Sequence, residues 1–170
     1  TALPMILAEE LEADWKQIEI EQAGASTLYG DQTTGGSASI RTTWDPMRKA
    51  GASAREMLIS AAALTWGVSR STCTAEAGHI KHAASNRSLS YGELVAKAST
   101  LPVPSDVTLK QSKDYKIVGQ RLPRLDSLAK VKGEAIYGID FHLPGMKYAV
   151  LARCPLIAGK VTSIDDKESK

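Results

Sequence analysis

The residues of this 170-residue chain that best suit ligand binding are two adjacent glycines flanked by hydroxyl side chains, in TTGGSASI at positions 33–40. Gly35 and Gly36 can adopt backbone angles that residues with a Cβ avoid, so the chain can turn its N–H groups toward a ligand. Ser37 or Ser39 is suited to cap a helix that begins here. Because a helix start offers unpaired N–H groups and the positive end of the helix dipole, this pattern favours binding of a phosphate or another anion.

The same stretch is also typical of a plain helix start that binds nothing. No lysine follows the glycines, so the pattern is not the phosphate loop of nucleoside triphosphatases, and it does not match G-x-G-x-x-G. Thr33 and Thr34 add hydroxyl donors. Arg41 and Arg48 follow a turn or two later, within reach of an anion, but exposed arginines are common on helices. These residues alone leave both an anion-binding loop and a structural loop open.

The histidines and cysteines do not form a second site. His79 and His82 are three positions apart in a strand-like segment, so they face opposite sides and cannot readily share a metal; we expect both at the surface. Cys73 and Cys154 lack metal-ligand spacing, and we expect two unpaired core thiols. No Ser–His–Asp or Cys–His arrangement is evident either, and the sequence offers no group of metal ligands.

The composition is that of an ordinary domain with a hydrophobic core. Hydrophobic residues make up 43% of the chain and charged residues 24%. The net charge of +2 is too small to indicate a nucleic acid or an anionic membrane as partner. Aromatic residues are only 5%, so the core must rest on Ala, Leu, Ile and Val. No apolar run is long enough for a membrane span.

The elements that precede the glycines are predicted to be a helix and a strand. Residues 2–15 repeat apolar side chains at helical spacing, with Glu9, Glu10 and Glu12 largely off the apolar face. Residues 16–23 alternate apolar and polar side chains, which predicts a short half-buried strand.

After the glycines, the spacing within residues 39–68 predicts a helix of about 27 residues, rich in alanine for close packing. Pro46 lies either in its first turn or at a kink, and Gly67 ends it. Short hairpin strands should follow, with turns at 77–78 and 85–86. The sequence Ser-Tyr-Gly-Glu at 90–93 fits a capping box and predicts a helix over 91–99.

The rest of the chain changes character twice. Residues 101–123 are rich in proline and poor in periodic apolar positions, which predicts an extended connector on a surface. From residue 124 onward, we expect a helical turn at 127–131 and strands near 135–137, 146–153 and 160–164. The fold class is therefore α+β, with domains at 1–100 and 124–170 joined by the connector, and the second domain is expected to be incomplete.

Because the first helix begins directly after Thr1, we expect this chain to be a piece of a longer protein. Its location, bacterial periplasm or cytoplasm, is left open.

Five longer segments follow one another along the chain: LPMILAEELEADW, TGGSASI, RKAGASAREMLISAAALTWGV, YGELVAKASTLPVP and RLDSLAKVKGEAIYGIDFHLPGM. Together they resemble the large, molybdopterin-binding subunit of the molybdenum hydroxylases, the family of xanthine dehydrogenase and aldehyde oxidase. The likeness is greatest to the branch that holds the beta chain of isoquinoline 1-oxidoreductase and its aldehyde dehydrogenase relatives. It extends over nearly the whole chain.

The resemblance implies a site divided between two places in the sequence. In similar proteins a G-Q-G-x-x-T element before the first helix touches the cofactor, and here Thr1 matches only its last position. A T-G-G-S loop is a second contacting element. It maps onto Thr34, Gly35, Gly36, Ser37, Ala38 and Ser39. Residues 1–100 would then be part of the molybdopterin-binding domain, and 124–170 the start of a mixed α/β hammerhead domain.

The resemblance also implies an activity for the intact enzyme, which would hydroxylate aldehydes or N-heteroaromatic rings with oxygen from water. The cofactor would be molybdopterin, possibly in its dinucleotide form. The expected partners are the remainder of the large subunit, a small subunit that carries iron–sulfur clusters, and a small-molecule substrate. The family's catalytic glutamate has no match here, so we expect no catalytic residue in this chain, which alone should be inactive. The alternative is a non-catalytic assembly segment without direct cofactor contact.

Overall fold

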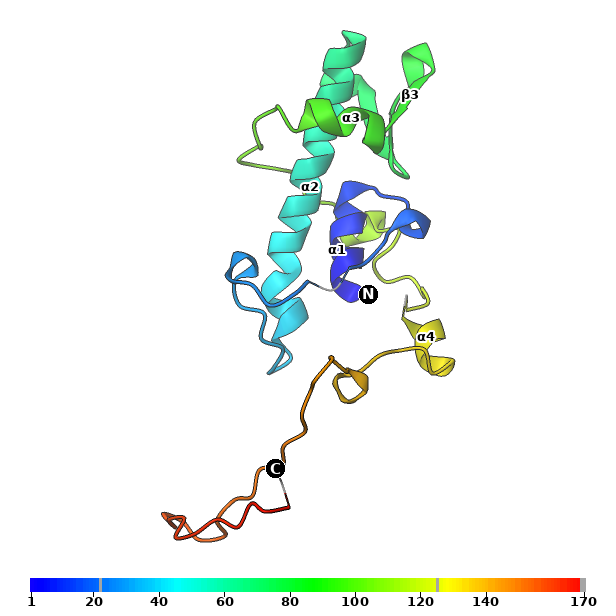
Figure 1. Cartoon of the computed structure of the whole chain (residues 1–170). Coiled ribbons are helices and arrows are strands. Elements are labelled where there is room, and N and C mark those ends of the chain that lie inside the picture. Colours follow the sequence, from blue (N-terminus) through cyan, green and yellow to red (C-terminus); the bar gives the residue numbers. More distant parts are fainter. Residues whose placement is uncertain (22, 125, 169–170) are drawn as a thin grey trace. The chain divides into compact units, whose positions relative to one another are not determined.

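The computed structural model describes residues 1–21, 23–124 and 126–168 (Figure 1). The chain divides into two units, Thr1–Ser127 and Leu128–Lys170. The first unit combines helices with a three-stranded antiparallel sheet, so the predicted α+β class is confirmed. No helix within the described residues is long and apolar enough to cross a membrane.

Helices α1 (Ala2–Leu11) and α2 (Ala38–Trp66) pack side by side and run in the same direction (Figure 1). Their contact is close at Gly51, where an added Cβ would lie 2.5 Å from the carbonyl oxygen of Leu7. Ala52 beside it is fully buried. The predicted close packing of the alanine-rich helix is therefore confirmed. The small side chains let the two backbones approach.

The ends of α2 agree with the sequence in part. Gly67 ends the helix in the left-handed region, at φ 67°, as predicted. Pro46, however, lies inside the helix because α2 already begins at Ala38. Of the two predicted positions for Pro46, the one in the first turn is therefore wrong. Proline has no N–H, and the helix therefore lacks the hydrogen bond to the carbonyl one turn earlier.

The sheet consists of β1 (Cys73–Glu76), β2 (His79–His82) and β3 (Arg87–Ser90), in that order. The predicted turns are present, since Ala77, Gly78 and Asn86 all have positive φ. Helix α3 (Tyr91–Ala98) follows directly. It starts with the predicted capping box, in which the Ser90 N–H donates to Glu93 at 2.8 Å.

The hydrophobic core lies between α2, the sheet and α3. Its buried members are Leu58, Ala61, Ala62, Ala63, Cys73, Ile80, Leu94 and Ala98. Cys73 is thus a core thiol, as expected. His82 is also buried, which corrects the prediction of a surface residue; it shares a 2.7 Å hydrogen bond with Ser85 and lies beside Trp66. His79 is partly exposed at the opposite end of β2, so the two histidines do not converge.

The strand predicted at residues 16–23 is wrong as far as the structure describes this segment. A 3₁₀ turn, Trp15–Gln17, begins there instead, because the Asp14 carboxylate accepts a hydrogen bond from the Lys16 N–H at 3.0 Å. Among the described residues, no strand pairs with positions 18–21. A strand alone cannot satisfy its backbone, so the alternating pattern has no effect here.

The second unit contains α4 (Ser127–Val131) at its border and the 3₁₀ turn Gly138–Asp140. The predicted helical turn is confirmed. The strands predicted near 135–137, 146–153 and 160–164 are absent from the described residues, and Cys154 is exposed rather than in a core. Val150 and Ile157 are almost completely exposed. Since strands need partners and a covered face, apolar patterning alone does not form them.

Candidate functional site

The segment before the glycines is a closed loop, held by Gln32. Its side-chain amide donates to the carbonyl of Gly24 at 3.2 Å and accepts from the Ser26 N–H at 3.1 Å. A 3₁₀ turn, Thr27–Tyr29, lies inside this loop. The loop borders an open hollow of about 560 Å³. The hollow is lined by Ala25, Ser26, Thr27, Gly30, Asp31, Gln32 and Thr33.

The glycines reach α2 through two consecutive left-handed residues, Gly36 at φ 56° and Ser37 at φ 53°. The Ala38 N–H donates to the Gly35 carbonyl at 3.0 Å. Ser37 occupies the N-cap position, but its hydroxyl makes no capping bond within the described chain, so the predicted serine cap is wrong. Ser39 lies inside the first turn. The start of α2 is therefore not capped by either serine.

The space in front of α2 is open. A Cβ added to Gly35 or Gly36 would meet no described atom within 4 Å. Thr34, Ser37 and Ser39 are exposed, and Ala38 is partly exposed. The segment Thr34–Ser39 therefore offers hydroxyl and backbone groups to solvent at a helix N-terminus.

Two charged residues flank this loop. Asp31 is exposed, and hydrogen bonds from the hydroxyl and the N–H of Thr33 lower the pKa of its carboxyl; the N–H bond measures 2.9 Å. Arg41 is exposed in the first turn of α2. The negative charge is thus already bonded within the loop, while the positive charge lies at the helix start.

Thr1 lies at the start of the neighbouring helix. It is the N-cap residue of α1 and is partly exposed. Because α1 and α2 run in parallel, the first residues of both helices lie at the same end of the unit (Figure 1). The positive ends of two helix dipoles therefore face the same way. The structure thus places both sequence-predicted elements, Thr1 and Thr34–Ser39, at this end.

Sequence reasoning missed a buried cluster of charged side chains between α1, α2 and the connector. We call Glu9, Glu10, Arg48, Arg55 and Lys110 the carboxylate clamp. The side chains of Glu9 and Glu10 are 2% and 0% exposed, although their helical positions lie off the apolar face. Their position off the apolar face therefore gives no indication of their burial.

Within the clamp, Glu10 joins α1 to α2. Arg48 Nε donates to the Glu10 carboxylate at 2.7 Å. Arg55 Nη1 donates to the Glu10 backbone carbonyl at 2.6 Å and lies 3.5 Å from its carboxylate. Both arginines also reach the connector, at the carbonyls of Lys110 (2.5 Å) and Thr108 (2.9 Å). Arg48 is therefore occupied by structural partners, and of the two arginines considered from the sequence only Arg41 is exposed near the glycines.

Glu9 joins α1 to the connector. Its carboxylate accepts hydrogen bonds from the N–H groups of Lys116 (2.9 Å), Ile117 (2.6 Å) and Val118 (2.9 Å), and pairs with the Lys110 ammonium. Burial raises the pKa of Glu9, but these hydrogen bonds outweigh it and the net shift is downward. Burial lowers the pKa of Lys110, but hydrogen bonds to the carboxylates of Glu12 and Glu9 outweigh it and the net shift is upward.

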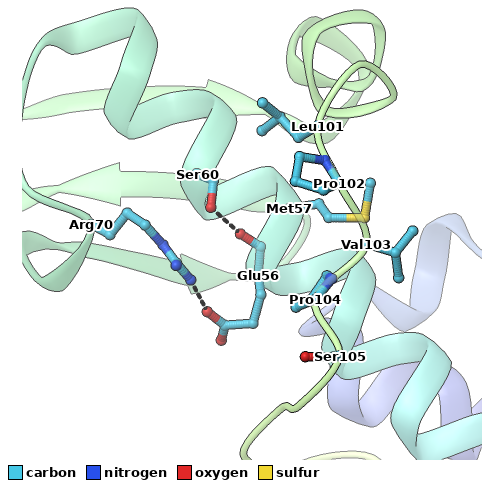
Figure 2. A pocket seen from close by; sticks show the side chains of 9 residues that line it. All are labelled: Glu56, Met57, Ser60, Arg70, Leu101, Pro102, Val103, Pro104 and Ser105. Carbon is cyan, nitrogen blue, oxygen red and sulfur yellow. Dashed lines mark hydrogen bonds and ion pairs between the residues drawn. The ribbon is translucent and has the colours of Figure 1, made fainter.

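A separate pocket of about 380 Å³ lies midway along α2, against the start of the connector. Figure 2 shows Glu56 paired with Arg70 at 2.6 Å, while the Ser60 hydroxyl donates to the Glu56 carbonyl at 2.8 Å. Pro102 and Pro104 form an apolar wall (Figure 2). Because Glu56, Ser60 and Arg70 are already bonded to one another, this pocket offers no group of converging polar atoms that could bind a ligand.

Comparison with known proteins identifies the class to which this fold and site belong. The model of the molybdopterin cofactor-binding domain family matches residues 1–140. The match covers more than half of the chain, and the chain belongs to this family. The predicted resemblance, and molybdopterin as the cofactor of the family, are thereby confirmed.

Individual relatives are similar over almost the whole chain. It is 34% identical to the beta chain of isoquinoline 1-oxidoreductase from Brevundimonas diminuta, over 98% of this chain and 26% of that protein. It is 36% identical to the membrane-bound aldehyde dehydrogenase (pyrroloquinoline-quinone) of Gluconacetobacter polyoxogenes, over 100% of this chain and 23% of that protein. A nicotinate dehydrogenase subunit from Pseudomonas putida is 34% identical over 91% of this chain and 13% of that protein. The chain spans about a quarter or less of the length of these relatives.

Proposed function

We propose that the start of α2 and the start of α1 form two parts of one cradle for the molybdenum cofactor. Residues Thr34–Ser39 supply the first part and Thr1 the second. The observation that carries this proposal is the parallel packing of α1 and α2, which brings both N-termini to one end (Figure 1). The family match makes the bound group a molybdopterin.

The donor set suits the phosphate of such a cofactor. Backbone N–H groups in the first turn of α2 point along the helix toward its N-terminus, and the dipole adds positive potential there. Gly36 and Ser37, at positive φ, turn the chain so that the approach to these groups is open. The hydroxyls of Thr34 and Ser39 add donors, and Arg41 adds a positive charge in the same turn.

In this arrangement the chain binds and orients, and performs no proton transfer itself. Gly36 and Ser37 hold the phosphate end, and the start of α1 contacts the cofactor from the neighbouring helix. The molybdenum cofactor, when bound, supplies the redox chemistry. Positioning it on two packed helices limits its motion, because helices are more rigid supports than loops.

For the whole protein we propose a molybdenum-dependent oxidoreductase that hydroxylates an aldehyde or an N-heteroaromatic ring with oxygen from water. The names of the relatives, which are oxidoreductases and dehydrogenases, support this class. Electrons would leave through iron–sulfur clusters on a small partner subunit. Residues 101–123 would be the connector and 124–170 the start of the hammerhead domain, to be completed by the remainder of the large subunit.

The test is a Gly36→Val variant of the intact large subunit, purified with its partner. At φ 56° a β-branched residue is strained, and its side chain would enter the open space before α2. We expect the molybdenum content per polypeptide to fall about tenfold, the size usual when a positioning contact of a metal site is lost. Molybdenum is measured by inductively coupled plasma mass spectrometry, independently of activity.

The matched control is Gly67→Val, at the other end of the same helix. Gly67 has a similar positive φ of 67° and equally open surroundings, so the substitution causes comparable backbone strain. We expect it to leave the molybdenum content unchanged. Wild-type molybdenum content in Gly36→Val would contradict the cradle and favour the alternative of an assembly segment without cofactor contact.

A further inference from the structure

The carboxylate clamp spans three segments that lie far apart in the sequence. Glu9 and Glu10 come from α1, Arg48 and Arg55 from α2, and Lys110 from the connector. All five side chains are at most 14% exposed. Because ion pairs in such surroundings require good geometry on both sides, they fix the segments to a narrow range of relative positions.

The carboxylate clamp fixes how far α1 is displaced relative to α2 along the helix axes, and we call this displacement the offset. Arg48 and Arg55 are seven residues apart in α2, and both bond to Glu10 from one helix. Gly51 lies between them in the sequence and contacts Leu7 and Glu10 closely. A slide of α1 by one turn would break both arginine contacts and move Glu10 away from the glycine. The offset is therefore fixed by charge geometry and by close backbone contact.

The connector closes the clamp on its remaining side. The Lys110 N–H donates to the Glu10 carboxylate at 3.1 Å. The Lys110 ammonium pairs with the carboxylate of Glu9 and lies 2.8 Å from that of Glu12. Arg48 also lies 5.4 Å from the ring of Trp44 and 5.6 Å from that of Tyr115, on the α2 and connector sides. The guanidinium is thus held by carboxylate, carbonyl and aromatic partners at once.

We propose that Glu10 and Arg48 are positioning residues for the cofactor, because they set the start of α1 relative to the start of α2. This inference rests on the proposed two-part cradle. Its two parts lie on different helices, so their separation depends on the offset between the helices. The clamp touches the helix bodies, and it acts on the cofactor only through Thr1 and the Gly36–Ser37 turn.

The experiment uses Arg48→Lys in the intact large subunit, which keeps the charge and supports folding. Lysine cannot reproduce the planar fork that joins Glu10 to the Lys110 carbonyl. We expect the cofactor to dissociate about tenfold faster during gel filtration, the scale of loss seen for residues that orient ligating groups. The near-ultraviolet circular dichroism of the bound pterin should change as well. Glu10→Gln is the second variant and should have the same two effects.

The control for a general loss of stability is Leu94→Ala. Leu94 is buried in the core between α2, the sheet and α3, away from the clamp. It should lower the melting temperature at least as much as Arg48→Lys, while the rate of molybdenum loss and the pterin spectrum stay as in the wild type. If Leu94→Ala and Arg48→Lys lose molybdenum equally, or if Arg48→Lys loses none, the positioning role is wrong.

The outcomes also separate this inference from the cradle itself. If Gly36→Val depletes molybdenum and Arg48→Lys does not, the cradle stands and the positioning role falls. If Gly36→Val has no effect, the cradle falls, and the positioning role falls with it.

Discussion

Two adjacent glutamates on α1 have the same chemistry but different tasks. Glu10 receives guanidinium groups from a neighbouring helix, and Glu9 receives backbone N–H groups from the connector. Successive helical residues point about 100° apart, so the two carboxylates meet different main partners, although Glu10 also accepts the Lys110 N–H of the connector. A single helix is thereby tied to two segments by two consecutive residues.

The lowered pKa of Glu9 predicts how stability depends on pH. A carboxyl whose pKa is lower in the folded state contributes stability above its unfolded pKa, near 4.5, and this contribution is lost as the pH falls through the folded pKa. Glu9→Gln should therefore lower the free energy of unfolding at pH 7 by about 1–3 kcal/mol, because the buried N–H groups lose a charged acceptor. The deficit should start to shrink as the pH falls below 4.5, and it should vanish as the pH falls through the lower folded pKa, where the wild-type carboxylate is protonated too.

Urea unfolding between pH 3 and pH 7 measures this difference. Glu19→Gln is the control, since Glu19 is an exposed residue of an irregular segment. An equal deficit for Glu9→Gln at both ends of the pH range would show that the loss does not come from the charge.

For single residues, the sequence predicts only those features whose cause lies in the residue itself or its immediate neighbours. The positive φ of Gly36 and the Ala77-Gly78 turn follow from glycine's backbone freedom. The burial of Glu9 and Glu10 has no local signal, because their helical positions lie off the apolar stripe. Their partners Lys110 and Ile117 are about a hundred residues away along the chain.

Among the elements, the contact between α1 and α2 is the one that the candidate site depends on most. Gly51→Ala should weaken it, since the new methyl group would lie 2.5 Å from the Leu7 carbonyl oxygen. We expect a loss of about 1–3 kcal/mol in the free energy of unfolding, as for other overpacked contacts. Urea denaturation followed by far-ultraviolet circular dichroism measures it.

Gly92→Ala in α3 is the matched helical control. The nearest atom to its new Cβ would be the Ser90 hydroxyl oxygen at 4.0 Å, an ordinary contact. Alanine's higher helix propensity should make this variant neutral or more stable by about 0.5–1 kcal/mol. If Gly51→Ala behaved in the same way, the helices would not be in such close contact.

Elements with signals in neighbouring residues, including the hairpin strands and their turns, were predictable, and strands that need distant partners were not. The long helix, its Gly67 end and the Ser90–Glu93 capping box all have signals within a few residues. The strands predicted at 16–23 and after residue 135 have the right alternation but lack paired neighbours among the described residues. Strand formation is decided by contacts that alternation does not encode.

For the whole molecule, the exposed second unit predicts that amide hydrogen exchange differs between this chain alone and the proposed large subunit. Several of its apolar side chains, among them Val150, Ile157 and Val161, are more than three quarters exposed. In the proposed large subunit these would be covered. Amides of residues 146–164 should therefore exchange with deuterium within seconds in the 170-residue chain and be protected about a thousandfold in the intact subunit, about 4 kcal/mol of local stability.

The comparison is made by mass spectrometry of peptides from both forms, with residues 58–63 of α2 as the internal reference. This stretch lies in the core of the first unit and should be protected in both. Equal, fast exchange of residues 146–164 in both forms would show that the rest of the subunit does not cover them.

The three consecutive N–H groups that hold Glu9 form a concave receptor of the kind that binds free anions in other proteins. Here the occupant belongs to the same chain. A tethered ligand acts at an effective concentration set by the chain that links it, often in the millimolar range. The connector therefore needs no phosphate, chloride or organic acid from its surroundings to close on α1. One anion receptor is thus filled by the chain's own carboxylate, and in the proposed cradle a second, at Gly36, would stay open for the cofactor.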